Sequence, residues 1–403
     1  MSPNSKDNRW GRLLISAVVA LLLVVADYGV QNISFPLFDD VSLLAWIDQV
    51  VGSNKDYFDE EDVTYVNVGK DKALVPIVDE WGDTIGNDVI TDRETLLRFL
   101  DLATKSDYRY IFMDVRFEEG FATSVDSALF GQIEQMPNVI VATHREVNGY
   151  AIADSALLPK AANADYRSTI FSGFSRYEFL QGGRRSVALR MLHDIDSHDI
   201  SKHWYGYVCD DGSLCYNLKC IPLPNNLFSS NAVLLRDNTI GEEMRYPYLG
   251  SMILNPQRYS EDEVIQNLLN DKIVIVGDYD NDLHETYVGE LPGPVISFAA
   301  YKFLRAGLHK VSVLYVIFLF VFFFLISLTI LSIRHVANIF TKGTFWNFIL
   351  SFLGIGALFF VVKIILYKFF LLSMIMVVPT VIFHLMGNIS NVRTFFISKN
   401  DGR

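Results

Sequence analysis

The stretch KIVIVGDYDNDLHETYVGELPG, from Lys272 to Gly293, decides the fold class of this chain. It opens with a short apolar run that ends in a glycine, and such a run predicts a buried strand. Three aspartates at alternate positions and a histidine follow, and a Gly/Pro-rich segment closes the stretch. The pattern is compatible with a nucleotide-binding turn, a metal-binding loop or a structural turn at the end of a strand.

The nucleotide and calcium interpretations each lack residues that they need. A nucleotide turn requires G-x-G-x-x-G or G-x-x-x-x-G-K-[ST], and IVIVGDYDND contains neither. The alternating acids resemble an EF-hand loop, but Leu283 stands where that loop needs its glycine and Gly289 stands where it needs its bidentate glutamate. A less regular calcium or zinc site stays open. We expect a structural loop, with no metal and no cofactor.

Such a loop still lies where ligands usually bind, because ligands of α/β sheets sit at the carboxyl ends of the strands. Acidic residues follow two of the predicted strands there. The candidate ligand-binding residues are Asp114, Asp278, Asp280, Asp282 and His284. For Asp114, a role as a capping or turn residue is the alternative.

Strand and helix signals alternate along the chain. Runs rich in β-branched residues predict strands at 62–68, 110–115, 138–142 and 272–276. A capping box at 91–94 opens one helix, and apolar spacing predicts further helices at 124–136, 185–193, 261–269 and 294–304. This alternation implies an α/β domain with a mainly parallel or mixed sheet and flanking helices.

The composition adds membrane spans to this domain. Of the 403 residues, 51% are hydrophobic and 20% are charged, a mixture typical of a water-soluble part joined to a few spans. Long apolar runs predict four transmembrane helices, at 13–30, 311–333, 345–367 and 369–389. The first run also fits a signal peptide, but no A-x-A cleavage site follows it, and we favour an uncleaved anchor.

Basic residues indicate the orientation of these spans. They occur in the N-terminal segment 1–12, between the second and third spans, and in the tail 390–403, and the positive-inside rule places these segments in the cytoplasm. The block 31–309 is then extracytoplasmic. All but three of the 46 acidic residues lie in that block. An acidic domain of this kind does not seek nucleic acid or anionic lipid.

All three cysteines, Cys209, Cys215 and Cys220, lie close together in this block. An oxidising envelope permits one disulfide among them and leaves one cysteine over. Because an Asp-Gly turn follows Cys209, that residue is placed to pair with either of the other two across a hairpin. With only His203 nearby, the three make a poor zinc site.

The other polar features give little support to catalysis. The chain has no G-x-S-x-G and no H-E-x-x-H, and its histidines are scattered, so we expect no enzyme activity. The pair Arg184-Arg185 is compatible with an anion site at a helix N-terminus, although pairing with local carboxylates is favoured. Asp27, Lys363 and His384 lie in or near the spans, but no polar stripe typical of an ion pathway accompanies them.

Three segments carry a resemblance to a known family: VTYVNVG (63–69), YIFMDVRFEEGFATSVDSALFGQIEQMPNVIVATH (110–144) and KIVIVGDYDNDLHETYVGELPGPVISFAAYKFLRAG (272–307). In these segments the chain resembles the CHASE type-2 family, the extracellular sensory domains associated with cyclases and histidine kinases. The order of one span, a domain and three spans is also that of the family. Gly69-Lys70 is a departure, because many members carry acidic residues there.

The resemblance implies a sensory role. Members often continue into a cytoplasmic output domain, whereas here only a short tail ending NVRTFFISKNDGR follows Ile389, so we expect any signal to leave through a separate effector. The alternative is a structural scaffold in an envelope complex. The expected partners are the lipid bilayer, another membrane or envelope protein or a second copy of the chain, and an unknown small ligand. The expected location is a bacterial inner membrane, with the large domain in the periplasm.

Overall fold

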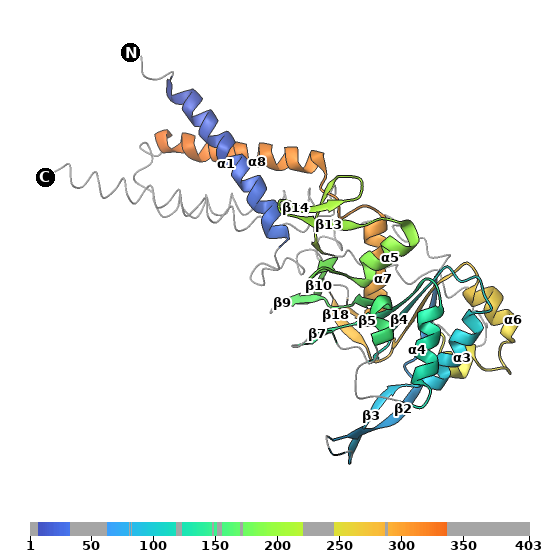
Figure 1. The fold of residues 1–403 in the computed structure, drawn as a ribbon. Coiled ribbons are helices and arrows are strands. Elements are labelled where there is room, and N and C mark those ends of the chain that lie inside the picture. The colour runs from blue at the N-terminus through green and yellow to red at the C-terminus, as the bar shows by residue number, and fades with distance from the viewer. Residues whose placement is uncertain are drawn as a thin grey trace. The chain divides into compact units, whose positions relative to one another are not determined.

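The computed structural model describes residues 7–32, 63–79, 81, 83–117, 123–146, 149–150, 155–169, 172–220, 246–286 and 289–336 (Figure 1). The chain divides into two compact units. The helical unit consists of Met1–Ser53, Ser213–Cys220 and Lys310–Arg403, and the α/β unit consists of Asn54–Gly212 and Ile221–His309. The spans predicted at 345–367 and 369–389 lie outside the described residues.

A five-stranded parallel sheet forms the centre of the α/β unit. Its strands lie in the order β1 (Val63–Asn67), β17 (Ile273–Gly277), β4 (Tyr110–Asp114), β5 (Val139–Thr143) and β8 (Ala161–Asn163). All residues of the edge strand β1 and of its inner neighbour β17 are buried, as expected for strands of a parallel sheet covered on both faces. The predicted α/β fold with a mainly parallel sheet is therefore confirmed, and the opening run KIVIV supplies the strand β17.

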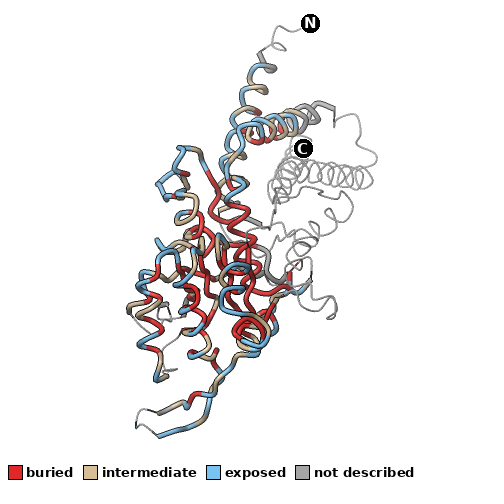
Figure 2. Tube along the Cα trace, turned by 90° about the vertical axis from the view of Figure 1, so that its right-hand side faces the viewer, coloured by how far each residue is buried: buried red, intermediate tan, exposed pale blue. Residues whose placement is uncertain are grey.

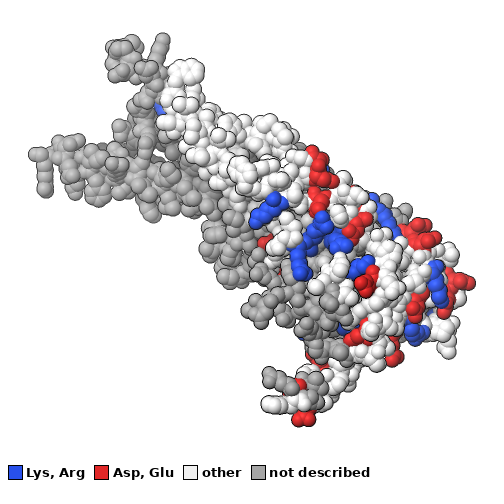
Figure 3. Space-filling model, in the orientation of Figure 1, with Lys and Arg blue, Asp and Glu red and all other residues white. Residues whose placement is uncertain are grey.

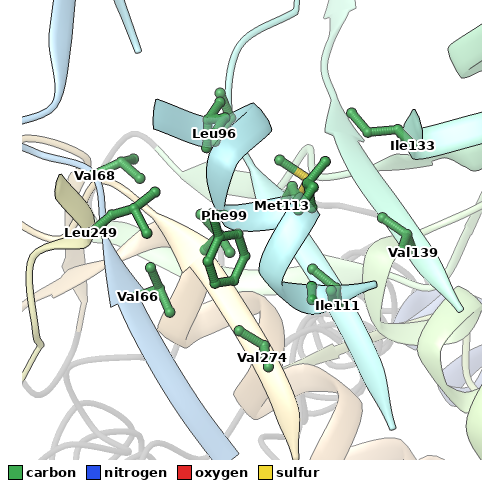
Figure 4. Packing of buried hydrophobic residues seen from close by; sticks show 14 of the residues in the cluster. Val66, Val68, Leu96, Phe99, Ile111, Met113, Ile133, Val139, Leu249 and Val274 are labelled. Carbon is green, nitrogen blue, oxygen red and sulfur yellow. The ribbon is translucent and has the colours of Figure 1, made fainter. Parts of the chain in front are cut away.

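Helices cover both faces of this sheet (Figure 1). On one face lie α3 (Arg93–Ala103), α4 (Asp126–Gln135) and the continuous pair α6 (Glu261–Val264) and η6 (Ile265–Leu269). Their apolar side chains, among them Leu96, Phe99 and Ile133, pack against alternate strand residues such as Ile111 and Val274 (Figure 4).

The other face carries α5 (Val187–Asp196) and α7 (Gly293–Arg305). Tyr110 of β4 points to this side, where its hydroxyl donates to Asp194 of α5 at 2.7 Å. The two helices are joined by Tyr301, whose hydroxyl donates to Asp196 at 3.0 Å. Twelve of the thirteen residues of α7 are buried, so this helix is a core element of the unit.

Helix α3 begins one residue later than the predicted capping box implies. Thr91 is the last residue of a strand, and Asp92 is the N-cap, with its carboxylate accepting the Glu94 N–H at 3.1 Å and the Thr95 hydroxyl at 2.6 Å. The expected capping box at 91–94 is therefore wrong by one position. A true capping box opens α6 instead, formed by Ser260 and Glu263.

Several strand pairs outside the central sheet were not predicted. The longest is the antiparallel hairpin of β2 (Lys72–Val78) and β3 (Thr84–Thr91), which extends away from the unit and is largely exposed (Figures 1 and 2). The others are short: β6 (Arg145–Glu146) with β7 (Gly149–Tyr150), β9 (Arg167–Thr169) with β10 (Ser172–Glu178), β11 (Leu180–Gln181) with β12 (Arg184–Arg185), β13 (Ile200–His203) with β14 (Gly206–Cys209), and β18 (Leu283–Thr286) with β19 (Gly289–Pro292). The 3₁₀ helix η3 (Ser155–Lys160) and the π-turn η5 (Leu249–Ile253) complete the described elements of the unit.

The helical unit contains α1 (Asp7–Gln31) and α8 (Val313–Val336). By length and composition, the stretch Trp10–Gly29 of α1 can cross a membrane; in α8 the described apolar stretch, Val313–Leu328, is shorter. The described helices show almost no charged side chains on the face seen in Figure 3. Helix α8 starts two residues later than predicted because Val311 is held in an extended segment, where its N–H donates to the Leu214 carbonyl at 2.8 Å.

The segment Ser213–Cys220, with the short strands β15 (Leu214–Cys215) and β16 (Leu218–Cys220), contacts both helices of this unit. The Tyr28 hydroxyl of α1 donates to the Cys215 carbonyl at 3.1 Å, and Tyr216 joins an apolar cluster with Ala20 and Tyr315. Tyr315 also donates to the buried carboxylate of Asp27 at 3.2 Å. The predicted extracytoplasmic block 31–309 is thus interrupted by a segment that belongs with the helices.

The expected turn after Cys209 is present, because Gly212 has a φ of 80° and its N–H donates to the Cys209 carbonyl at 2.9 Å. The side chains of Cys209 and Cys215 are both buried and are not bonded to each other. The side chain of Cys220 lies outside the described residues. A disulfide that involves Cys220 stays a prediction.

Candidate functional site

The carboxyl ends of the five parallel strands meet at one edge of the sheet, which we call the carboxyl edge. Residues at or just beyond the ends of β1, β17, β4, β5 and β8 line it: Asn67, Asp278, Asp114, His144 and Asp165. All five predicted candidates lie at this edge or in the loop that rises from it. The structure divides them into two groups with different surroundings.

The first group, Asp278 and Asp280, holds the loop to β1 and to the start of β2. Lys72 donates to Asp278 Oδ2 at 2.6 Å, and Asn281 donates to the same carboxylate through both its backbone and its side chain. Asn67 of β1 donates to Asp280 Oδ1 at 3.2 Å. Gly69 lies directly beside them: a Cβ there would lie 2.6 Å from Asp280 Oδ2 and would displace that side chain.

With these contacts, Asp278 is an ionised carboxylate that forms an ion pair with Lys72. Burial alone would raise the pKa of its carboxyl, but the hydrogen bonds from Lys72 and Asn281 outweigh that effect and lower the pKa below its usual value. The stability that Asp278 contributes is then present above the usual carboxyl pKa and is lost only in strong acid. The two residues act as structural turn acids, which was the favoured expectation for this loop.

The second group brings Asp282 and His284 toward residues that sequence analysis did not place with them. The acid–histidine cluster consists of Asp114, His144, Asp165, Asp282 and His284. Two close pairs lie within it: His144 Nδ1 is 3.3 Å from Asp165 Oδ1, and His284 Nε2 is 3.0 Å from Asp282 Oδ1. The ring of Tyr166 meets that of His284 edge to face, with 4.9 Å between centroids.

Asp114 has the most perturbed carboxyl group of the cluster. The pKa of Asp114 is raised to about 7, chiefly by burial and then by the negative charge of Asp282, while the nearby imidazoles of His144 and His284 act in the opposite direction. The pKa of His144 is also raised, chiefly by its hydrogen bond to Asp165 and then by the charges of Asp114 and Asp282, against the effect of burial. The cluster therefore changes its charge near neutral pH.

The cluster is in direct contact with the start of α7. The Gly293 N–H donates to the Asp282 carbonyl at 2.9 Å, and a Cβ on Gly293 would lie 2.3 Å from Asp282 Oδ2 and 3.1 Å from His284 Nε2. At Gly277, a Cβ would lie 2.3 Å from Cγ of Pro294 and 3.4 Å from Cβ of Asp114. Gly277 is needed because β17, β4 and the first turn of α7 approach so closely, whereas a side chain at Gly293 would displace the side chains of Asp282 and His284.

The arrangement fits proton exchange better than metal binding. Among the side chains that the structure describes, no three His, Cys, Asp or Glu residues are grouped so that they could hold a metal ion. Carboxyl and imidazole groups that share protons near neutral pH can instead respond to pH or to a positively charged group brought close to them. We derive no reaction from this set.

Comparisons with protein-family models, with curated proteins and with solved structures give no match. The resemblance to the CHASE type-2 family therefore stays a prediction based on the three segments quoted above.

The pH dependence of stability follows from the raised pKa values. A carboxyl whose folded pKa is raised loses stability as the pH rises from its usual value, about 4, to about 7. His144, with a raised folded pKa, contributes stability below about pH 6.5 and loses it at higher pH. Urea unfolding of the full chain in detergent, followed by circular dichroism, is expected to show falling stability between pH 5 and pH 8.

Asp114→Asn should flatten this profile. The variant is expected to match the wild type near pH 5 and to gain on the order of 2 kcal/mol at pH 8, because the amide cannot ionise. The matched control is Asp107→Asn, at an exposed carboxylate before β4, which should leave the slope unchanged. Equal slopes for Asp114→Asn and the wild type would contradict the assignment of the titration to Asp114.

Proposed function

We propose that the chain is a membrane-anchored sensory protein of the bacterial envelope that passes the charge state of the acid–histidine cluster to a separate effector. The observation that carries this proposal is the contact between Asp282, His284 and Gly293, the first residue of α7. Helix α7 continues, after the short link 306–312, into α8 of the helical unit. One covalent path therefore leads from the cluster to a predicted transmembrane helix.

Electrostatics supplies the force for such a signal. A helix N-terminus favours negative charge nearby, so neutralising Asp114 or Asp282 weakens the attraction that holds the first turn of α7. Protonation and a bound cationic group have the same sign of effect on this turn. A proton or a cation shifts α7 from one position to another only to the extent that it binds the cluster more tightly in one of these positions than in the other. The stimulus we propose is thus acidification or a small positively charged ligand.

The membrane part of the proposal rests on the sequence and on one helix. The apolar stretch Trp10–Gly29 of α1 is long enough for a span, and in the helical unit α1 and α8 are joined by the Tyr315–Asp27 hydrogen bond. A buried polar bond between two apolar helices ties them more firmly than apolar contact alone. We propose four spans, with both termini in the cytoplasm and the α/β unit in the periplasm, as the positive-inside rule favours.

A scaffold role is the second candidate, and one feature favours it. The β2–β3 hairpin exposes a set of large apolar side chains, with exposed fractions of 71% at Leu74, 85% at Trp81, 67% at Ile85 and 56% at Val89. Leu74 and Val89 are direct cross-strand partners, so they form one patch. Apolar patches of this kind on a projecting element mark protein interaction surfaces. In this reading the hairpin holds an envelope protein permanently.

One experiment separates the two functions. The tagged chain is purified gently from its native membrane at pH 6 and at pH 8, and the bound proteins are identified by mass spectrometry. The same is done with Leu74→Ser/Val89→Ser, which removes the hairpin patch, and with the control Ile85→Val, which keeps it. A sensor is expected to hold a kinase, cyclase or regulator in amounts that change with pH and that do not depend on the hairpin.

A scaffold gives the opposite pattern. Its bound set would be stoichiometric, unchanged by pH, and lost from the serine variant but not from the valine control. That outcome would replace the sensory function by the scaffold function. A chain that emerges without any bound protein at both pH values would contradict both.

A further inference from the structure

A cavity of about 460 Å³ lies in the α/β unit beside β8, the edge strand of the sheet. Residues of η3, the β11–β12 hairpin, α5 and the start of β13 line it. Its volume falls within the range that small-molecule sites occupy in proteins. None of its lining residues belongs to the acid–histidine cluster, so it is a separate feature of the unit.

The lining of this cavity is basic, although the block around it is acidic. Three arginines, Arg184, Arg185 and Arg190, face one carboxylate, Asp199. The apolar remainder includes Leu158, Leu180 and Ile200. Guanidinium groups beside apolar side chains are the combination that recognises a small organic anion, because the planar fork matches a carboxylate or a phosphate.

Two of the arginines are fixed in place by other groups. Arg185 donates to the two carboxylate oxygens of Asp199 through Nε and Nη2, so the two side chains form a bidentate pair. Arg190 donates to Asp194 Oδ2 at 2.7 Å and to the Pro159 carbonyl at 3.1 Å. Each guanidinium has five N–H donors, so these bonds leave donors that can reach a ligand. Pre-positioned donors reduce the entropy lost on binding.

The hairpin that presents Arg184 and Arg185 depends on two glycines. Gly182 and Gly183 have φ values of 56° and 84°, the left-handed region that the two central residues of a tight β-hairpin require. Leu180 pairs with Arg185 and Gln181 with Arg184 across this turn. Ser186, the next residue in the chain, is the N-cap of α5, and its side chain accepts the Leu189 N–H at 3.2 Å.

We propose that this cavity binds a small organic anion, with its carboxylate or phosphate group held by Arg184 and Arg185 and its apolar part against Leu158, Leu180 and Ile200. Binding at this place would stabilise α5, because Arg190 is linked through Asp194 to Tyr110 of the central strand β4. The anion site acts independently of the acid–histidine cluster.

The test uses the full chain in detergent at low salt. Hexanoate and hexyl phosphate carry the two candidate head groups, and hexanol is the matched neutral probe. Isothermal titration calorimetry is expected to detect binding of at least one anion and none of hexanol. Arg184→Gln should weaken that binding roughly tenfold or more, because it removes a charge-assisted contact. Arg184→Lys, which keeps the charge and loses the fork, should fall in between.

Arg98→Gln, at an exposed arginine of α3, is the matched control and should bind like the wild type. Binding of one anion and not the other would identify the head group. Failure of both anions to bind, equal binding of hexanol, or equal affinity of Arg184→Gln and Arg98→Gln would each overturn the proposal. Unfolding of the Arg184→Gln variant is not expected, because the side chain is exposed.

Discussion

Gly277→Ala is expected to destabilise the α/β unit by about 1–3 kcal/mol, in spite of adding a single methyl group. The new Cβ would lie 2.3 Å from Cγ and 3.2 Å from Cβ of Pro294. A proline ring in the first turn of a helix cannot move aside by changing rotamer, so β17 and α7 must separate. Urea unfolding of the full chain in detergent, followed by circular dichroism, measures the loss.

The control for this prediction is Gly131→Ala, in the middle of α4. No atom lies within 4 Å of a Cβ at that glycine, and alanine has the higher helix propensity, so this variant should gain about 0.5–1 kcal/mol. The two substitutions are chemically identical and are expected to differ in sign. A Gly277→Ala protein as stable as the wild type would show that the end of β17 is not tightly packed against α7.

Arg93→Ala is expected to cost about 3–5 kcal/mol, the range for breaking a buried ion pair. Arg93 is the first residue of α3, and its side chain is 2% exposed. It donates to the Arg116 carbonyl, lies 3.9 Å from Asp126 at the start of α4, and stacks over the Phe117 ring with 4.4 Å to its centroid. One guanidinium thus joins the starts of two helices to the loop that leaves β4.

The pKa of Arg93 reflects the free-energy cost of keeping its positive charge buried. Burial lowers the pKa of Arg93 to about 10, although the carboxylate of Asp126 acts to raise it. Removing the side chain leaves Asp126 without its cation and the Arg116 carbonyl without its donor. The unit should therefore be weakened more than the loss of packing alone explains, although the Asp126 carboxylate keeps its hydrogen bonds from the Thr123 N–H and hydroxyl.

Three variants test the role of Arg93 by urea unfolding. Arg98→Ala, on the exposed side of the same helix, should change the free energy of unfolding by less than about 0.5 kcal/mol. Arg93→Met keeps the apolar stem and should recover part of the loss. Combining Arg93→Ala with Asp126→Asn should cost less than the sum of the two single changes. Equal losses for Arg93→Ala and Arg98→Ala would contradict the link.

The sequence predicts the central sheet well because its strands are long apolar runs. The strands expected at 62–68, 110–115, 138–142 and 272–276 are β1, β4, β5 and β17, with ends shifted by at most one residue. The β2–β3 hairpin escaped prediction because its strands contain Pro76 and Gly86 and lie mostly exposed, so they lack a buried apolar periodicity.

The candidate site was predicted in part. The placement of Asp114, Asp282 and His284 at one edge follows from the parallel order of β4 and β17. The separation of Asp282 from Asp278 could not be predicted from this order, because it depends on the turn at 280–281, after which the chain enters β18. The pairing of His144 with Asp165 requires that β5 and β8 be neighbours, and this long-range fact has no signal in either residue's local sequence.

The position of β17 in the sheet also determines the order in which this protein can be built. β17 lies between β1 and β4, so until residues 273–277 have left the ribosome β1 has no partner strand in the central sheet and β4 has only β5. In the nascent chain β1 therefore waits for more than two hundred residues, and the open edge of β4 for more than one hundred and fifty, while both can pair with other strands. Pairings that distant in sequence fold slowly and are prone to aggregation in the interval. We expect synthesis of this chain to depend on chaperones until α7 has emerged.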